Sequence, residues 1–530
     1  MSAHVDRFVL DNLPPRAGWP RLLFDLPELQ YRRTLNCTSE LLGRASSERP
    51  DAVAIRCLEG NWSFARLLAT VNQICRVLTE DLGVVPGNRV LLRGSNSAMM
   101  IAAWLAVAKA GAVVVATMPM LRARELSTIV EKGQVGLALC EASLVRELEE
   151  VRDGGGPLQR IVTWNGELES LTRGKPESFD AVPTAQDDPC LLAFTSGTTG
   201  QPKATVHFHR DILAMADTFS RNLLRPQADD VFAGTPPLAF TFGLGCELVF
   251  PFRVGASTAI LSGTKPEQVL EDIERHRITR LFTAPTAYRG MLGVLERQSL
   301  ASLRSCVSAG ENLPRATFDA WVAATGMQII NGIGATEMTH IFISAAGEDI
   351  RPGSTGKAVP GYRACVVDER MKPLPPGQVG RLAVQGPTGC RYLADERQSR
   401  YVVDGWNVTG DAYVMDEQGY FWFEARTDDM IISSGYNIAG PEVEEALLKH
   451  PAVAECAVIG IPDEQRGQIV KAVVVLRAGH EPDARMSSAL QSFVKGVIAP
   501  FKYPRKIEYA RELPPTSTGK LQRFKLRQEG

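Results

Sequence analysis

Up to about residue 400, short runs of β-branched and other apolar residues alternate with segments long enough to form helices, and this alternation constrains the fold more than any other feature. Continuous apolar runs of this kind are typical of strands buried on both faces of a parallel sheet, with the helices as crossovers. We therefore predict an α/β fold with mostly parallel sheets. The strand candidates are VLLRG (90–94), AVVVAT (112–117), GLALC (136–140), RIVTW (160–164), STAIL (257–261) and RLFTA (280–284), and helix candidates include residues 267–276 and 287–298.

The last hundred or so residues have a different pattern. A helix begins near Pro441, and it is followed by two apolar runs (453–461 and 469–478), a second helix (487–499) and a strand (506–510). This is enough for a small α+β domain, and 530 residues are too many for one compact core. We predict a large N-terminal domain, residues 1–427, and a small, mobile C-terminal domain, residues 428–530.

Composition excludes several classes of function. The chain has 58 Lys and Arg against 60 Asp and Glu, a net charge of −2, which gives no electrostatic basis for binding nucleic acid or an anionic membrane. Its ten cysteines include no C-x-x-C pair, which favours a reducing cytoplasm over a disulfide framework or a zinc site. The N-terminus lacks the pattern of a signal peptide. The apolar stretch 99–121 is interpreted as a buried helix, a glycine cap and a strand. We expect a cytoplasmic protein with no membrane span.

Residues 194–204, FTSGTTGQPKA, are a candidate phosphate-binding loop after a strand-like run. Successive N–H groups of a Gly-rich turn bind anions, and hydroxyl groups and a lysine add donors. The loop differs from the common phosphate loop, because Pro202 separates the second glycine from the lysine and Ala204 stands where Ser or Thr would hold magnesium. The candidate phosphate-binding residues are Thr195, Ser196, Gly197, Thr198, Thr199, Gly200 and Lys203.

The nine-residue pattern T-S-G-T-T-G-x-P-K resembles the phosphate loop of the adenylate-forming superfamily, which includes acyl- and aryl-CoA synthetases, carrier-protein adenylation domains and luciferases. Residues 331–337, NGIGATE, resemble a second motif of that superfamily. The resemblance implies that Glu337 binds Mg²⁺, for which a carboxylate oxygen is a suitable ligand, and that Thr336 contacts the α-phosphate. Ile333 replaces a tyrosine that stacks on adenine elsewhere in the family. The other nucleotide-binding residues implied here are Gly310, Glu311, Asn331 and Gly332.

Three more motifs follow in the order that the superfamily has them. TGD at 409–411 implies that Asp411 binds the ribose hydroxyls. ARTD at 425–428 resembles G-R-x-D, with Ala425 in place of the glycine, and implies that Arg426 binds the nucleotide and that Asp428 is the hinge. PPTSTGK at 514–520 resembles the terminal motif, whose lysine, Lys520, reaches the forming acyl phosphate.

The resemblance implies two half-reactions with ATP, Mg²⁺ and coenzyme A. A carboxylate first joins the α-phosphate of ATP and expels pyrophosphate, while Lys520, Thr336 and the Mg²⁺ on Glu337 stabilise the developing charge. The small domain then rotates about Asp428, and the thiol of CoA displaces AMP. Ser434, Gly435 and Tyr436 are expected to lie beside the thiol tunnel. A free carrier protein in place of CoA, and a homodimer, stay open.

The acid pocket is expected to bind a small aromatic carboxylic acid. The stretches 205–211, 338–342 and 434–441 resemble benzoate– and 2-aminobenzoate–CoA ligases, so we expect 2-aminobenzoate first and benzoate next. Aromatic and aliphatic walls suit a flat ring. The resemblance assigns a gate to residues 237–243. The expected pocket residues are Phe240, Thr241, Phe242, Ala309, Gly334, His340 and Ile341.

Other functions stay open on the sequence alone. A medium-chain or branched acyl-CoA synthetase would differ in the depth of the acid pocket, which the sequence does not give. A non-catalytic acyl-adenylate binding protein has the same fold as an enzyme, although the retained Lys520, Glu337 and Asp411 argue against it. A luciferase is a weaker alternative. For His207 and His209, structural and functional roles are equally open.

Overall fold

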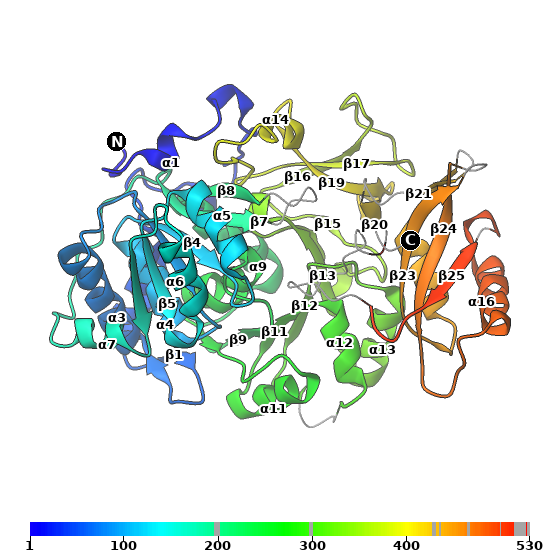
Figure 1. Cartoon of the computed structure of the whole chain (residues 1–530), viewed down its shortest axis with the longest axis horizontal. Helices are drawn as coiled ribbons and strands as arrows, with labels where there is room; N and C mark the ends of the chain where they lie inside the picture. The colour runs from blue at the N-terminus through cyan, green and yellow to red at the C-terminus, as the bar shows by residue number, and fades with distance from the viewer. Residues whose placement is uncertain are drawn as a thin grey trace.

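The computed structural model describes residues 1–195, 202–295, 300–426, 431–433, 436–463, 467–498, 500–513 and 526. The strands in this part of the chain form four sheets (Figure 1). Two of them are the largely parallel sheets that the sequence predicts, so the α/β assignment is confirmed.

The first parallel sheet has the order β6-β5-β3-β4-β7-β8. Every neighbouring pair is parallel except β7 and β8, which form an antiparallel hairpin. The predicted strands at 90–94, 112–117, 136–140 and 160–164 are all present. The strands are β3 (Arg89–Arg93), β4 (Val113–Thr117), β5 (Leu137–Glu141), β6 (Arg160–Trp164), β7 (Pro189–Thr195) and β8 (Lys203–Phe208). Helices α4 (Ala98–Lys109), α5 (Ala123–Gly133) and α6 (Arg146–Asp153) lie between them in the chain, and α3 (Phe64–Arg76) precedes β3.

The second sheet has the order β15-β14-β13-β12-β11-β9-β10-β1-β2, and its centre, from β13 to β1, is parallel. The strands are β1 (Val53–Arg56), β2 (Trp62–Ser63), β9 (Val231–Gly234), β10 (Ser257–Ala259), β11 (Arg280–Thr283), β12 (Ser305–Ser308), β13 (Ile329–Gly334), β14 (Ile341–Ser344) and β15 (Lys357–Ala358), with α11 (Pro266–His276), α12 (Pro285–Leu292) and α13 (Arg315–Thr325) between them. Helix α12 ends earlier than the predicted 287–298, because Gly293 caps it.

The third sheet is antiparallel and was not predicted. It has the order β16-β17-β19-β18, with β20 paired to β19. Its strands mix polar and apolar residues, so they lack the continuous apolar runs by which the parallel strands were recognised. They are β16 (Arg363–Val367), β17 (Val379–Gln385), β18 (Val402–Val403), β19 (Trp406–Met415) and β20 (Phe421–Arg426).

The C-terminal residues form the predicted small α+β unit, at one end of the molecule (orange to red in Figure 1). Helix α15 packs on β23 and α16, and it also contacts β20 and α13 of the preceding part of the chain. The elements are β21 (Ile431–Ser433), β22 (Tyr436–Ile438), α15 (Gly440–Leu448), β23 (Val453–Asp463), β24 (Gly467–Leu476), α16 (Ala484–Val497) and β25 (Lys506–Tyr509).

Other helices complete the part of the chain that precedes the small unit. They include α1 (Phe8–Asp11), α2 (Cys37–Glu48), α7 (Glu167–Thr172), α8 (His209–Met215), η5 (Ala216–Leu224), α9 (Thr241–Leu244), η6 (Gly245–Val249), α10 (Phe250–Val254) and α14 (Gln398–Tyr401). Throughout the described residues, every helix is too short or too polar to cross a membrane.

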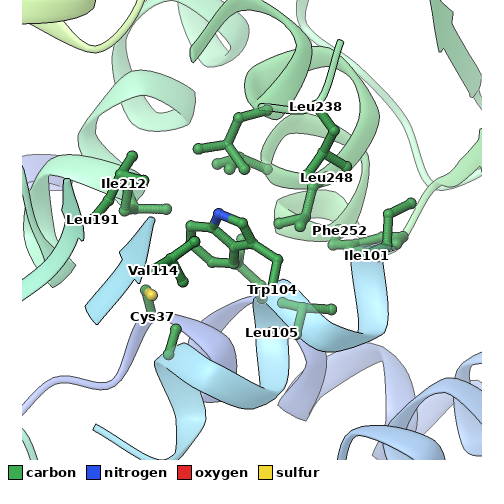
Figure 2. Close-up of a cluster of buried hydrophobic side chains, with 14 of the residues drawn as sticks. Cys37, Ile101, Trp104, Leu105, Val114, Leu191, Ile212, Leu238, Leu248 and Phe252 are labelled. Carbon is green, nitrogen blue, oxygen red and sulfur yellow. The ribbon is translucent and has the colours of Figure 1, made fainter. Parts of the chain in front are cut away.

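Helix α4 is the centre of the core, as expected for the apolar stretch 99–110. Trp104 on this helix is fully buried. Figure 2 shows it between side chains of α2, β4, β7, α8 and the segment 238–252. That segment contains part of the predicted gate, so the gate rests on the most buried part of the molecule. The neighbours labelled in Figure 2 are Cys37, Ile101, Leu105, Val114, Leu191, Ile212, Leu238, Leu248 and Phe252.

Candidate active site

The β7–β8 hairpin holds the two ends of the candidate phosphate loop. Thr195 is the last residue of β7, Lys203 is the first of β8, and the two are paired across the antiparallel ladder. The predicted phosphate-binding residues between them, Ser196, Gly197, Thr198, Thr199 and Gly200, lie outside the described residues. The hairpin therefore fixes where this loop starts and ends.

Thr336 and Glu337 lie in a short 3₁₀ turn, η8 (Thr336–Met338), directly after β13. The backbone is conformationally restricted on both sides of this turn. A Cβ on Gly334 would lie 2.8 Å from the carbonyl carbon and oxygen of His340, and Thr339 has a φ of 67°, a left-handed conformation that is uncommon for threonine. Glu337 is 9% exposed. The restricted backbone of the turn limits the positions that its carboxylate can take.

Tyr392 connects Glu337 with Lys203. Its hydroxyl donates a hydrogen bond to Glu337 Oε1 at 2.5 Å and accepts one from Lys203 Nζ at 3.3 Å. Burial and the neighbouring Glu337 carboxylate raise the pKa of Tyr392 well above its ordinary value, so the hydroxyl stays protonated. The sequence analysis missed Tyr392, because it lies outside every motif and is 55 residues away from Glu337 along the chain.

A buried network on β8 and α8 supports Thr336. His207 Nε2 lies 2.8 Å from the Thr336 carbonyl oxygen, and since a carbonyl only accepts, Nε2 carries the proton. The other ring nitrogen is 3.9 Å from Asp211 Oδ2, and Asp211 forms an ion pair with Arg391. Burial acts to raise the pKa of Asp211, but the Arg391 charge and the His207 side chain outweigh it and hold the pKa below its usual value. His207 thus positions the turn that carries Thr336 and Glu337.

Residues 391–393 reach this site by pairing with β8. The Val206 N–H donates to the Arg391 carbonyl at 2.8 Å, and the Leu393 N–H donates to the Ala204 carbonyl at 2.9 Å. Side chains of consecutive residues in an extended segment point to opposite sides. Arg391 therefore meets Asp211, and the next residue, Tyr392, meets Glu337.

The predicted nucleotide-binding residues of β12 and β13 share one edge of the second sheet. Ser308 and Asn331 are paired in parallel register, so residues 309–311 follow β12 beside residues 331–333. Gly310 has a φ of 89°, which glycine adopts without strain. Ligands of open α/β sheets commonly bind at the carboxyl ends of the strands, and both segments lie at such ends.

Asp411 and Arg426 are brought together as paired residues of β19 and β20. Asp411 is buried, whereas the Arg426 side chain lies outside the described part of the structure. The third sheet joins the edge of the second one through the segment after β14. There the Thr355 N–H donates to the Phe421 carbonyl at 2.9 Å, and Gly356 bridges to Phe421.

His340 lies within a group of phenylalanine rings. Its ring centroid is 4.6 Å from that of Phe250 and 5.5 Å from those of Phe219 and Phe242. Within the described residues, neither of its ring nitrogens has a hydrogen-bond partner. Burial lowers the pKa of His340 to about 3, although the nearby Phe242 backbone acts in the opposite direction. The imidazole is therefore neutral at neutral pH.

Several other predicted pocket residues lie on elements next to His340, whereas Ala309 follows β12. Thr241 and Phe242 begin α9, directly after Phe240. Ile341 begins β14 next to His340 and is buried against β13, where a Cβ on Gly332 would lie 2.7 Å from Ile341 Cγ2.

The gate segment has an anchor that the sequence analysis missed. The Asn96 side chain accepts a hydrogen bond from the Leu238 N–H at 2.8 Å and donates to the Pro236 carbonyl at 3.0 Å. It also donates to Glu247 Oε1 at 2.7 Å. Glu247 is fully buried, and burial raises its pKa well above the ordinary range. The Asn96 side chain therefore links the segment before α4 to residues just before, within and just after the predicted gate.

His209 is part of the core. Its Nδ1 accepts a hydrogen bond from the Cys37 N–H at 3.2 Å and lies 3.2 Å from Cys37 Sγ, with Cys190 also close. Because Nδ1 has a single lone pair and the Cys37 N–H already uses it, these three residues do not form a metal site. Their contact holds α2 against α8.

Several predicted site residues lie outside the described residues. They are Lys520, the hinge Asp428, and Ser434 and Gly435 of the thiol tunnel. Tyr436 contributes its backbone to β22, and its side chain is not described. Their roles stay predictions.

Comparisons with known proteins indicate the same family as the residues of the site. A family profile described as AMP-binding enzyme matches residues 42–392, and one described as AMP-binding enzyme C-terminal domain matches residues 442–520. The benzoate–CoA ligase of Thauera aromatica is 34% identical over 513 residues, which cover 94% of this chain and 97% of that protein. The 3-hydroxybenzoate–CoA ligase of Aromatoleum sp. (strain CIB) is 30% identical, with 93% and 97% covered.

Two solved structures are similar along nearly the whole chain. The anthranilate CoA ligase AuaEII, in complex with anthranoyl-AMP, has a TM-score of 0.90 and 35% identity, and 95% of this chain and 99% of that one are covered. A benzoate CoA ligase from Burkholderia xenovorans LB400 has a TM-score of 0.86 and 30% identity, with 93% and 99% covered.

The fold and the site together define an adenylate-forming enzyme of the AMP-binding class. More narrowly, the chain belongs to the adenylate-forming CoA ligases, which are acid–thiol ligases that use ATP, Mg²⁺ and coenzyme A.

Proposed function

We propose that this protein is an aryl-acid:CoA ligase whose preferred acid is 2-aminobenzoate, followed by benzoate. The observation that carries the proposal is the group of rings around His340, with Phe219, Phe242 and Phe250 within 5.5 Å of its centroid. Aromatic rings favour edge-to-face and offset contacts with another flat ring. The names of the similar ligases, which act on benzoate, 3-hydroxybenzoate and anthranilate, support the same class of acid.

The neutral imidazole of His340 favours an acid with a hydrogen-bond donor on its ring. Its unprotonated nitrogen is buried without a partner in the described part of the chain, and a buried unpaired polar group costs about 1–3 kcal/mol. A ring amino group next to the carboxylate donates to the unprotonated nitrogen and removes this cost. Benzoate has no such donor, so it makes the same contacts with the rings but leaves the nitrogen of His340 unpaired.

In the first half-reaction, an oxygen of the acid attacks the α-phosphorus of ATP, and the bond from that phosphorus to the bridging oxygen of pyrophosphate breaks. Lys203 holds the outer phosphates, and Thr336 and Lys520 stabilise the charge that develops on the α-phosphate. Glu337 fits a Mg²⁺ ligand, because among the described residues its Oε2 has no hydrogen-bond partner while Oε1 is held by Tyr392. When bound, Mg²⁺ supplies positive charge to the phosphate oxygens.

In the second half-reaction, the sulfur of CoA attacks the carbonyl carbon of the acyl adenylate, and the bond to the phosphate oxygen of AMP breaks. We propose that the domain of residues 428–530 turns about Asp428 between the two half-reactions. This movement withdraws Lys520 and brings Ser434, Gly435 and Tyr436 beside the thiol.

The test is pyrophosphate release with MgATP over a panel of acids, with and without CoA: benzoate, 2-aminobenzoate, salicylate, 4-hydroxybenzoate, hexanoate and octanoate. We expect CoA-dependent turnover with 2-aminobenzoate and benzoate. His340→Phe should lower kcat/KM for 2-aminobenzoate relative to benzoate by about tenfold or more, because a site built to pair a polar group discriminates against its loss.

A preference for octanoate would refute the aryl pocket and favour a medium-chain acyl-CoA synthetase. That alternative has a specific basis, since the mouse mitochondrial acyl-coenzyme A synthetase ACSM3 is 32% identical over 89% of this chain. An unchanged ratio of the two aryl acids in His340→Phe would show that another residue selects the ring substituent.

A further inference from the structure

We propose that Tyr392 is a positioning residue for the magnesium site, which holds one oxygen of Glu337 and keeps Lys203 apart from that carboxylate. This inference rests on the proposed role of Glu337 as the Mg²⁺ ligand. Tyr392 acts through Glu337 and Lys203, and it contacts no substrate in this assignment.

The first step of the argument is the polarity of the two hydrogen bonds. The Tyr392 hydroxyl donates to Glu337 Oε1 at 2.5 Å and accepts from Lys203 Nζ at 3.3 Å. The Lys203 ammonium also lies 5.1 Å from the centroid of the Tyr392 ring. The Tyr392 hydroxyl thus lies between the Lys203 ammonium and the Glu337 carboxylate and forms a hydrogen bond with each. With Oε1 held in this way, Oε2 is the oxygen that would be available to a cation.

The second step is that Tyr392 has a fixed position. It is fully buried, its ring packs edge-on against Tyr401 with centroids 5.8 Å apart, and its backbone N–H donates to Gln398 Oε1 at 2.8 Å. The preceding residue, Arg391, is tied to β8 and to Asp211. A hydroxyl held from several directions imposes its geometry on the Glu337 side chain.

The third step is what happens without the hydroxyl. A nearby carboxylate and ammonium attract each other, so removal of the Tyr392 hydroxyl leaves Lys203 and Glu337 to pair directly. Such a pair places the ammonium on the carboxylate in competition with Mg²⁺, and it draws Lys203 away from the phosphate loop. Loss of a residue that orients a metal ligand typically lowers metal affinity 10- to 100-fold.

The experiment is Tyr392→Phe in the full chain, with Mn²⁺ as a paramagnetic probe. Binding of Mn²⁺ is measured by electron paramagnetic resonance in the presence of α,β-methylene-ATP, which is not cleaved. We expect Mn²⁺ affinity to fall by about tenfold or more. In turnover, the Mg²⁺ concentration for half-maximal pyrophosphate release should rise while the KM for the acid stays the same.

The matched control is Tyr288→Phe. Tyr288 is also fully buried, and its hydroxyl donates to the Val307 carbonyl at 3.0 Å in a different core cluster. This variant loses a buried tyrosine hydroxyl and should bind Mn²⁺ as the wild type does. Equal affinity of wild type and Tyr392→Phe overturns the inference, and so does an equal loss in both variants.

Glu337→Gln separates this inference from the proposed function. If Glu337→Gln leaves Mn²⁺ affinity unchanged, the proposed role of Glu337 is wrong. If Glu337→Gln weakens binding and Tyr392→Phe does not, only the role of Tyr392 is wrong. Should Tyr392→Phe lose its cooperative melting transition, 4-fluorophenylalanine at position 392 keeps the size of the ring and removes the donor. Unchanged Mn²⁺ affinity in that variant overturns the inference as well.

Discussion

His340 is a residue whose chemistry depends strongly on the fold. The sequence predicted that it belongs to the acid pocket, on resemblance alone. The structure adds three phenylalanine rings from η5, α9 and α10, and a pKa lowered to about 3. None of these neighbours is close to residue 340 in the sequence, so no local pattern gives the neutral state of the ring.

The lowered pKa of His340 predicts an acid-sensitive stability. The ordinary pKa of 6.5 applies to the unfolded chain, and the folded value is about 3. Below pH 6.5 the unfolded chain therefore binds a proton that the folded chain does not, and stability falls as the pH decreases toward 3. At pH 5.5 this loss is roughly 1 kcal/mol. We expect His340→Phe to lose about that much less than the wild type between pH 7.5 and 5.5 in urea unfolding. Equal losses in the two proteins would show that the ring is protonated in the folded state.

At the scale of elements, the gate region depends on one side chain from the first sheet. Asn96 lies between β3 and α4, and it binds Pro236, Leu238 and Glu247, which flank or belong to the gate. Leu238 and Leu248 also pack against Trp104 of α4 (Figure 2). The gate region is therefore held both by the hydrogen bonds of Asn96 and by apolar contacts with α4.

Asn96→Ala should loosen the gate. The substitution leaves the Leu238 N–H, the Pro236 carbonyl and the Glu247 carboxyl without this partner, at a cost of about 1–3 kcal/mol in stability. Because the gate is proposed to border the acid and not the nucleotide, we expect the KM for the acid to rise about tenfold and the KM for ATP to change less than about twofold. Steady-state kinetics with both substrates measure this.

Asn222→Ala is the control for the loosened gate. Its amide makes one hydrogen bond, to the Thr218 carbonyl at 2.8 Å within η5, so both KM values should be unchanged. If Asn96→Ala raises the two KM values equally, the contact supports the whole site rather than the gate.

Some elements can be predicted from the sequence and others cannot, because short-range patterns are visible in the sequence and long-range contacts are not. The strands β3 to β6 are continuous apolar runs, which a short window detects. The strands of the third sheet lack such runs; β19, for example, includes Asn407 and Asp411. Tyr392 and Asn96 act through long-range pairing with β8 and with the gate, so their roles follow only from the folded chain. Motif residues such as Glu337 could be proposed from the sequence because their spacing is local.

At the scale of the whole molecule, the C-terminal unit touches the rest of the chain through α15, which contacts β20 and α13. The two surfaces are not fully complementary in charge. Burial and the nearby Glu442 of α15 raise the pKa of Glu424 on β20, while Lys502 acts against this. Both carboxylates are only partly buried, and Glu442 pairs with Lys502 at 2.6 Å, so this contact would fit the proposed change of position of the unit.

Asp428→Pro tests the proposed hinge. Proline fixes φ near −65°, so the residue can no longer absorb the change in backbone angle that rotation requires. We expect kcat for thioester formation from supplied acyl adenylate to fall by about tenfold or more, and adenylate formation to change less than about twofold. The two rates are measured separately, as CoA thioester produced and as pyrophosphate released without CoA.

The control for the hinge is Glu417→Pro. Glu417 is exposed in the turn between β19 and β20, where proline fits the second position of the turn. Both half-reactions should be unaffected. Two intact half-reactions in Asp428→Pro would mean that the rotation occurs elsewhere or not at all.

The ion pair between Asp211 and Arg391 joins residues 180 positions apart, and this separation has a consequence for biosynthesis. At about 5–20 residues per second, the ribosome needs roughly 10–40 s after Asp211 before it adds Arg391. During that interval the nascent chain carries β8 and α8 without the guanidinium that neutralises their buried carboxylate. The ion pair that ties residue 391 to β8 and α8 therefore forms only late in translation.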